Sequence, residues 1–283
     1  MPNHPVAAIV CALVAALLIA VAAVAQQRAA AAVPEGASLV ANLVRSPRWW
    51  AGIVGDLGGY GMQVVALSFG AVLLVQPILV SALVFALPLS ARMNGRRITG
   101  RAAATAAVLV VALTMFLVVG RPTPGNNAAP LREWLPPLTI LLALVAAATL
   151  AGLRAAAPNA RALALGAAAG SLFGLSAALT DYVVTLFGRG PGAVVAGWQT
   201  WALLAAGLTG FYLQQRAFHA GPLSSSLPAA TVAEPLAAAF LGLTALDEHL
   251  RTDAAGLVVV GLAVAVMCWT AVALAREQAA PGA

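Results

Sequence analysis

The chain has 283 residues, of which 62% are hydrophobic and only 8% are charged. A soluble globular domain carries roughly 25% charged residues, so this composition excludes an ordinary soluble protein and indicates an integral membrane protein. The formal net charge is +6. Because the arginines are spread over the segments between long apolar runs, they favour a role in membrane orientation, and we expect a lipid bilayer rather than nucleic acid as the partner.

Apolar runs long enough to cross a bilayer, which takes about 20 residues, occur nine times along the chain. The expected spanning helices are 5–26, 49–69, 71–91, 102–120, 136–153, 162–187, 193–216, 223–246 and 254–275. The first run has no basic residue before it and exceeds the apolar region of a signal peptide, so we interpret it as a spanning helix. The pattern predicts an all-α integral membrane protein, a bundle of about nine transmembrane helices.

Arginine counting predicts the orientation of this bundle. One side of the membrane receives Arg28, Arg45, Arg48, Arg92, Arg96, Arg97, Arg101, Arg154, Arg161, Arg216 and Arg276, and the other receives Arg121, Arg132, Arg189 and Arg251. Because cytoplasmic loops are enriched in basic residues, eleven arginines against four place the first side in the cytoplasm. We expect a multi-pass protein of the plasma (inner) membrane with its N-terminus outside and its C-terminus in the cytoplasm.

Tryptophans cluster at the predicted helix ends, at Trp49, Trp50, Trp134, Trp198 and Trp201. We expect them to anchor the helices at the membrane interface.

The sequence contains an internal repeat at an offset of 151 residues. "WAGIVGDLGGYGMQVVALSFGAVLLVQP", from Trp50, aligns without a gap with "WALLAAGLTGFYLQQRAFHAGPLSSSLP", from Trp201. The matched residues are Trp50 and Trp201, Gly59 and Gly210, Gln63 and Gln214, Ala66 and Ala217, Gly70 and Gly221, and Pro77 and Pro228. The positions from Gly59 to Gly70 share one helix face, a small-residue stripe that lets helices approach closely. The glutamines in this stripe are expected either to pack there or to line a cavity.

The repeat pairs the second predicted helix with the seventh and the third with the eighth. An offset of five helices makes the two copies run in opposite directions, and inverted repeats are a common basis of alternating access in secondary transporters. We expect one membrane domain with a first repeat in 1–135, formed by helices one to four and an outer loop, and a second repeat in 136–283, formed by helices five to nine.

These segments resemble the drug/metabolite transporter (DMT) superfamily. The stretch from Trp49 to Arg97 is similar to the second and third helices of its EamA-like and NIPA-like members. The stretch from Tyr212 to Leu250, a small-residue helix followed by a proline-bearing helix and an acidic residue such as Glu248, is similar to their seventh and eighth helices. Ten-helix members consist of two repeats of five helices. The nine helices predicted here imply either that the first repeat has four helices or that one helix is not recognised in the sequence. The resemblance implies a permease; the NIPA-like branch is associated with magnesium. It leaves a monomer and a homodimer open.

Glu234 is the acidic residue expected deepest in the membrane. If its helix begins near Leu223, Glu234 lies about 16 Å along it at roughly 1.5 Å per residue, near the midplane of a core about 30 Å thick. A charged side chain there costs about 2.5–3.5 kcal/mol on insertion scales and is a functional candidate by default. The alternative is a structural glutamate bonded to a neighbouring helix. Pro228 and Pro235 on the same helix free backbone carbonyls, including that of Thr231, which could join Glu234 in holding a proton or a cation.

Two further acidic residues are weaker candidates. Asp56 lies in the cytoplasmic third of the second predicted helix. Three roles are open for it: gating of the transport pathway, binding of a cation, or an ion pair with an arginine. Asp181 and Tyr182 lie near the outer end of the sixth, where we expect an interfacial role. The candidate substrate-binding residues are Glu234, Gln63, Gln214, Asp56 and Thr231, and the candidate gating or helix-breaking residues are Pro77, Pro228 and Pro235.

The sequence thus favours a secondary transporter for a small polar or cationic solute, with proton coupling or transport of Mg²⁺ as sharper versions. The alternative is a non-transporting membrane partner, such as an accessory subunit for flipping of lipid-linked precursors in the cell envelope. An enzyme is not expected, because neither G-x-S-x-G nor H-E-x-x-H occurs and the three histidines form no constellation with a nucleophile. We expect no cofactor, and the sequence leaves metal ligands unknown.

Overall fold

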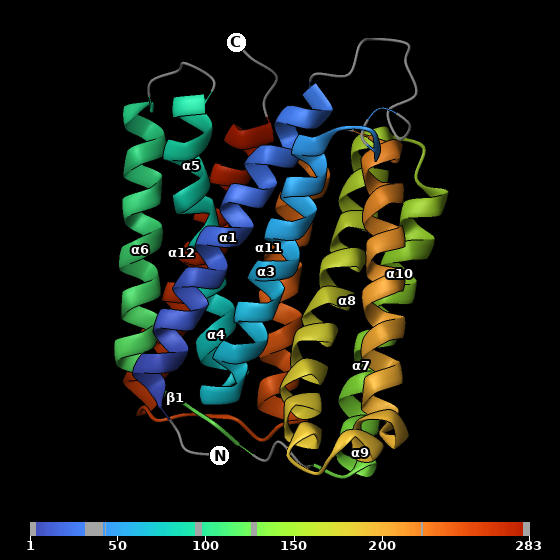
Figure 1. Ribbon diagram of the computed structural model, residues 1–283. Coiled ribbons are helices and arrows are strands. Elements are labelled where there is room, and N and C mark those ends of the chain that lie inside the picture. Colours follow the sequence, from blue (N-terminus) through green and yellow to red (C-terminus); the bar gives the residue numbers. More distant parts are fainter. Residues whose placement is uncertain are drawn as a thin grey trace.

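The computed structural model describes residues 4–31, 42, 44–93, 98–125, 129–221 and 223–279. These residues form a bundle of roughly parallel and antiparallel helices (Figure 1). The helices are α1 (Pro5–Ala31), α3 (Pro47–Phe69), α4 (Val72–Leu79), α5 (Ala82–Met93), α6 (Gly100–Gly120), α7 (Leu131–Arg154), α8 (Pro158–Phe187), α9 (Pro191–Ala196), α10 (Trp198–Ala220), α11 (Leu223–Thr244) and α12 (Ala254–Ala279). Two short strands, β1 (Pro122–Thr123) and β2 (His249–Leu250), complete the fold.

Seven segments in the described part of the chain are long and apolar enough to cross a membrane. They are Pro5–Ala25, Val72–Leu89, Gly100–Gly120, Leu131–Arg154, Pro158–Phe187, Ser225–Thr244 and Ala254–Glu277. The prediction of an all-α multi-pass membrane protein is therefore confirmed. Large apolar side chains such as Val111, Leu144 and Leu262 are exposed on the outside of the bundle, as a lipid-facing surface requires.

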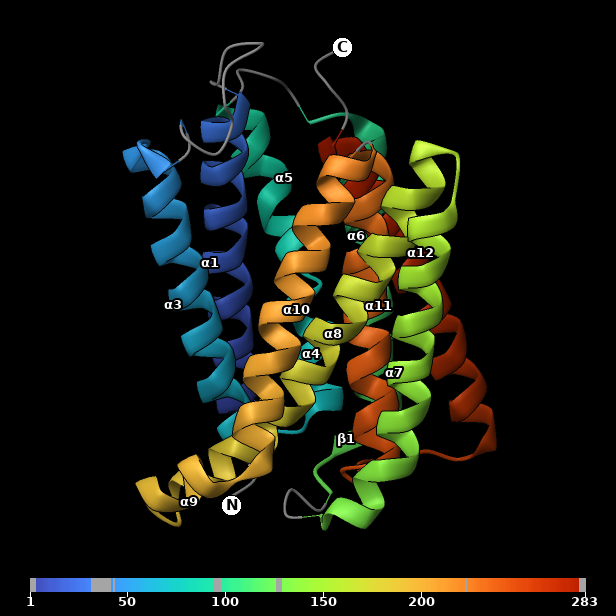
Figure 2. The same cartoon turned by 90° about the vertical axis from the view of Figure 1, so that its right-hand side faces the viewer.

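Helices α3 and α10 stand apart from these seven. Glycines, glutamines and aromatic residues lower the mean hydropathy of both helices. Both nevertheless run along the bundle, where α3 packs against α1 and α10 packs against α8 (Figures 1 and 2). Their outward faces carry exposed apolar residues, including Leu57 on α3 and Leu208 on α10. The protein core meanwhile centres on α8, which packs against α11, α10, α7 and α3 and is buried on almost every side.

The two ends of the bundle are defined by the chain direction. We call the end at which α1 begins the lower end, and the opposite end, at which α12 ends, the upper end (Figure 1). The described arginines divide between the ends as expected from the sequence: Arg28, Arg45, Arg48, Arg92, Arg101, Arg154, Arg161, Arg216 and Arg276 belong to upper segments, and Arg121, Arg132, Arg189 and Arg251 to lower ones. Arg96 and Arg97 lie outside the described residues.

Three boundaries differ from the sequence prediction. The single helix expected over 71–91 is divided into α4 and α5, because the backbone bonds around Val80 and Ser81 step by three residues instead of four. The helix expected over 193–216 is divided into α9 and α10 at Gly197. Helix α7 begins at Leu131 instead of 136, and Pro136 and Pro137 lie inside it, in its second turn.

Candidate functional site

Glu234 lies at mid-length of α11, as the sequence predicts, and its side chain is half-buried. The helix around it is pressed against α8. A β-carbon on Gly174 of α8 would contact the Glu234 carbonyl oxygen and would lie 2.8 Å from Ala237 Cβ. The backbone of α11 at Glu234 is therefore fixed against α8, which holds the carboxylate at a defined depth.

The close contact between α8 and α11 continues over three turns through glycines spaced by four. A β-carbon on Gly166 would lie 3.0 Å from Ser226 Cα, and one on Gly170 would lie 2.8 Å from Ala230 Cα. These are contacts with backbone, which cannot rotate away. The pattern G-x-x-x-G-x-x-x-G in α8 is a packing motif that brings two membrane helices together.

The two small-residue stripes predicted from the repeat pack against different helices. On α3, Gly59 faces Ala15 and Ile19 of α1, and Gln63, next on this face, is 6% exposed. On α10, Gly210 faces α8, and Gln214 follows it on the same face, half-buried. Of the two roles open for the glutamines, packing between helices fits these positions, Gln63 on the face of α3 toward α1 and Gln214 on the face of α10 toward α8.

The candidate helix-breaking prolines lie inside continuous helices. Helix α11 continues through Pro228 and Pro235, and α4 continues through Pro77 and ends two residues later. The helix-breaking interpretation is therefore wrong for α11, because tight packing on α8 holds the chain helical despite the missing N–H groups. Thr231 donates its hydroxyl proton to the Leu227 carbonyl at 2.8 Å, a bond within its own helix.

Asp56 lies in the third turn of α3 and is half-buried. Helix α3 also carries a direct polar contact to α8, where Tyr60 and Thr180 share a hydrogen bond of 2.7 Å between their hydroxyl groups. The tyrosine thus ties α3 to the central helix of the bundle, four residues along from Asp56.

Glu248 binds the start of α4 from the loop between α11 and α12. The backbone N–H of Val72 donates to Glu248 Oε1 at 2.6 Å, and that of Leu73 donates to Oε2 at 2.8 Å. Ala71, the residue before the helix, supplies no side-chain cap, so the distant carboxylate satisfies two of the orphan donors of α4. Gly242 leaves room for it, since a β-carbon there would lie 2.8 Å from Glu248 Oε2.

The Glu248 carboxylate is 2% exposed and lies outside the spanning segments. Burial raises its pKa to about 7, against the two backbone hydrogen bonds, which lower it. Glu248 therefore changes its charge near neutral pH at a position where it holds two segments together. The sequence marked Glu248 only as part of the family resemblance.

Asp181, on α8, is the acidic residue whose environment differs most from expectation. The interfacial role expected for Asp181 and Tyr182 is wrong: Asp181 is 1% exposed and Tyr182 is also buried. Neither carboxylate oxygen of Asp181 has a hydrogen-bond partner. The Glu248 carboxylate lies close enough to interact with it electrostatically.

An aromatic cluster lies beside this acidic pair. Trp134, expected at the membrane interface, is instead fully buried, with ring-centroid distances of 6.2 Å to Tyr182 and 5.8 Å to Trp198, both edge to face. Its indole N–H has no acceptor. The expected anchoring role is therefore wrong for Trp134, whereas Trp50 and Trp201 are exposed and suit it.

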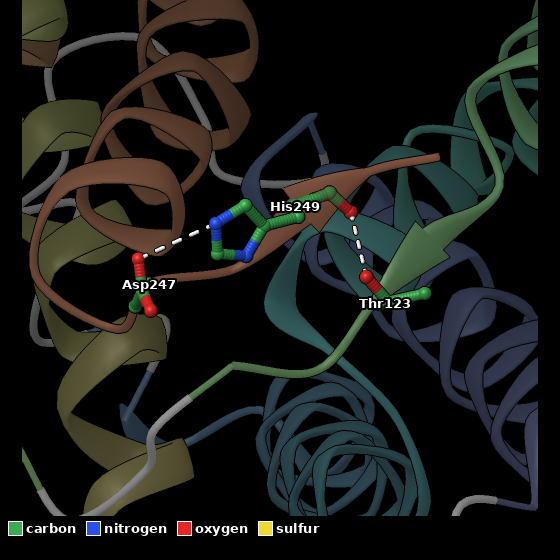
Figure 3. Close-up of polar contacts among 3 residues, drawn as sticks. All are labelled: Thr123, Asp247 and His249. Carbon is green, nitrogen blue, oxygen red and sulfur yellow. Dashed lines mark hydrogen bonds and ion pairs between the residues drawn. The ribbon is translucent and has the colours of Figure 1, made fainter. Parts of the chain in front are cut away.

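A two-strand ribbon covers the lower end near Glu248. Strand β1 pairs with β2 in antiparallel register, and Thr123 Oγ1 donates to the His249 carbonyl at 3.0 Å (Figure 3). The His249 side chain turns toward Asp247 at 3.5 Å, and both side chains are exposed. Asp247 has a φ of 54°, a left-handed conformation that aspartate tolerates, in the turn that precedes Glu248.

Among the described residues, no group of three or more His, Cys, Asp or Glu side chains lies close enough to hold a metal ion. A divalent cation in this part of the protein would need backbone carbonyls and retained waters as its other ligands, which Mg²⁺ accepts.

Comparisons with known proteins place the chain beside a bacterial relative. No family model matches it, and no solved structure matches it. It is 38% identical over 279 residues to the uncharacterized protein Cgl0250/cg0304 of Corynebacterium glutamicum, and the match covers 97% of this chain and 96% of that protein. The chain therefore belongs to the same family of proteins as Cgl0250/cg0304 of Corynebacterium glutamicum.

Proposed function

We propose that the protein is a secondary transporter, a permease that moves a small polar or cationic solute across the plasma membrane by alternating access between two inverted repeats. The observation that carries the proposal is that each stripe packs against the first helix of its proposed repeat, α3 against α1 and α10 against α8. Gly70, after α3, faces Ala8 of α1, and Gly221, after α10, faces Pro158 and Ala162 of α8. Adding the offset of 151 to residue 8 gives 159, between these two partners.

Other helix pairs support the same correspondence. Helix α1 packs against α4 and α5 as α8 packs against α11, and α6 packs against α12. Helices α1 and α8 run in opposite directions along the bundle, as inverted copies must (Figure 1). We therefore assign α1 to α6 to the first repeat and α8 to α12 to the second, with α7 between them. In this proposal the second repeat begins near residue 158 instead of 136, and α3 and α10 complete nine spanning helices.

Glu234 is the proposed solute contact. Its carboxylate is at mid-length of α11, and the backbone behind it is fixed against the glycines of α8. A carboxylate at that depth attracts a cationic group or accepts hydrogen bonds from a polar solute, and its protonated form can also donate one. In the proposed orientation the upper end, with most of the arginines, is cytoplasmic. This arrangement suits the drug/metabolite transporter superfamily, with Mg²⁺ as one candidate solute.

A binding screen tests the proposal. The purified protein is heated in detergent with Mg²⁺, other divalent cations, amino acids, nucleosides and cationic drugs, each in turn. A ligand at about 100 times its dissociation constant stabilises the folded state by about 2.7 kcal/mol. We expect one class to stabilise wild type but not Glu234→Gln, and the same class to be taken up by proteoliposomes.

The matched control is Glu133→Gln, which alters an exposed glutamate paired with Arg132 at 3.8 Å. It should bind and transport like wild type. If no solute class binds and no flux is measured, the transporter proposal fails, and a non-transporting membrane partner for the flipping of lipid-linked precursors becomes the better explanation.

A further inference from the structure

We propose that Asp181 and Glu248 form a buried site that binds one proton at the lower end of the bundle. In the transporter, this pair rather than Glu234 is the site of proton coupling, a role that rests on the proposed function.

Asp181 is the proton acceptor of the pair. It is 1% exposed, and both carboxylate oxygens lack a hydrogen-bond donor. An ionised carboxylate without donors is costly to bury, whereas the neutral acid is tolerated far better. Binding a proton from the solvent at an Oδ atom removes the charge and breaks no other bond. This makes Asp181 suited to receiving a proton and poorly suited to a fixed ion pair.

Glu248 is the first carboxylate of the pair to ionise. Two backbone N–H groups at the start of α4 hold its carboxylate, one on each oxygen. Buried carboxylates that interact with each other do not both ionise readily, and their protons are lost in coupled steps. The donors favour the negative charge on Glu248, which leaves the shared proton for Asp181. Burial, opposed by these two hydrogen bonds, raises the pKa of Glu248 to about 7.

Few other polar groups near this pair compete for the proton. Gln76, one turn along α4, is 2% exposed, and its amide nitrogen also lacks an acceptor, so it is a donor available at the same end of that helix. Helices α4 and α8 pack against each other. The ionisable groups on the neighbouring elements are Asp56 and Tyr60 of α3, the latter hydrogen-bonded to Thr180; Tyr182, in contact with Trp134; Glu234, at mid-length of α11; the exposed Asp247–His249 pair; Asp253, which accepts from the Gly256 N–H; and the exposed Arg121, Arg132, Glu133, Arg189 and Arg251.

The position of the pair links proton binding to movement. Asp181 belongs to α8, and Glu248 joins the α11–α12 loop to the start of α4. When the proton leaves, two buried negative charges repel each other across the contact between these segments. Loss of the proton therefore favours separation of the lower end of α8 from the loop and from α4, and binding of the proton favours closure.

Infrared difference spectroscopy tests the site without any solute. Wild-type protein in lipid nanodiscs is titrated from acid to alkaline pH, and the carbonyl band of protonated carboxylic acids is followed. Asp181→Asn removes no hydrogen bond seen in the structure, so it should fold. We expect it to lack the acid band that wild type keeps to the highest pH. Glu248→Gln should move the midpoint of that band to lower pH by about one unit, a tenfold change in proton affinity, because it removes the neighbouring negative charge.

Asp247→Asn is the matched control, an exposed carboxylate beside Glu248, and should leave the buried bands unchanged. Glu234→Gln identifies the band of Glu234. If Asp181→Asn keeps every acid band, or Glu248→Gln leaves the Asp181 midpoint where it was, the site is refuted, whether or not transport has been shown. If the bands behave as expected but Asp181→Asn proteoliposomes still accumulate solute on a proton gradient, the coupling role is refuted. Loss of that accumulation with retained solute exchange supports it.

Discussion

The contact between α8 and α11 gives a stability prediction that can be worked from distances. In Gly170→Ala the new methyl group would lie 2.8 Å from Ala230 Cα and 2.9 Å from its carbonyl carbon. Carbon atoms pack best at about 3.5–4.0 Å, so the helices must separate locally by roughly 0.7 Å. Overpacking of this kind costs about 1–3 kcal/mol, while alanine in place of a mid-helix glycine gains about 1 kcal/mol. The expected net effect is a destabilisation of about 1 kcal/mol.

The control is the same substitution where space is free. A β-carbon on Gly261 of α12 has no neighbour within 4 Å, so Gly261→Ala should be neutral or stabilising by up to about 1 kcal/mol. The two variants are compared by thermal unfolding in one detergent, where about 1–2 kcal/mol should separate them. Equal midpoints for Gly170→Ala and Gly261→Ala would refute the claim that backbone contact limits residue 170.

Three further predictions concern charge, a hydrogen bond and orientation. Because the folded-state pKa of Glu248 is about 7 against an ordinary 4.5, the stabilisation by its proton is complete below pH 4.5 and is lost as the pH rises through 7. At 1.36 kcal/mol per pKa unit this amounts to about 3 kcal/mol, so wild type should unfold at lower temperature at pH 8 than at pH 5. Glu248→Gln should flatten this dependence; an unchanged slope would contradict it. Tyr60→Phe removes the hydrogen bond to Thr180 and should lower the free energy of unfolding by about 1 kcal/mol in the same assay. An unchanged stability would argue against this hydrogen bond. Single cysteines introduced at Arg154 and Arg189 in a cysteine-free background should label from the inside and the outside of intact cells, respectively, and the reverse pattern would invert the proposed orientation.

The spanning helices could be predicted from the sequence because a bilayer demands long apolar runs, and the runs around α1, α6 and α12 contain little else. The break between α4 and α5 could not, since it depends on how backbone bonds shorten around Val80 within an apolar run that continues without change. The stripe from Gly59 to Gly70 was visible because helical spacing alone places those residues on one face.

The contacts of Glu248 and the burial of Asp181 could not be predicted from the sequence. The bonds from Val72 and Leu73 to Glu248 join residues more than 170 positions apart, and nothing local in either segment encodes them. Asp181 lies near a helix end, where an interfacial place is the usual outcome, and only the packing of other helices around α8 buries it. One signal was available in the sequence: glycines at 166, 170 and 174 mark α8 as a helix approached closely by another.

The ribbon of β1 and β2 has a mechanical consequence. It joins the segment that leaves α6 to the segment that enters α12, and the Arg251 N–H also approaches the Arg121 carbonyl at 3.5 Å. Since Glu248 lies in that same segment, the ribbon, the start of α4 and the loop before α12 are one cross-linked patch. A displacement of any one of the three segments is transmitted to the other two through these hydrogen bonds, so the patch should move as a rigid body.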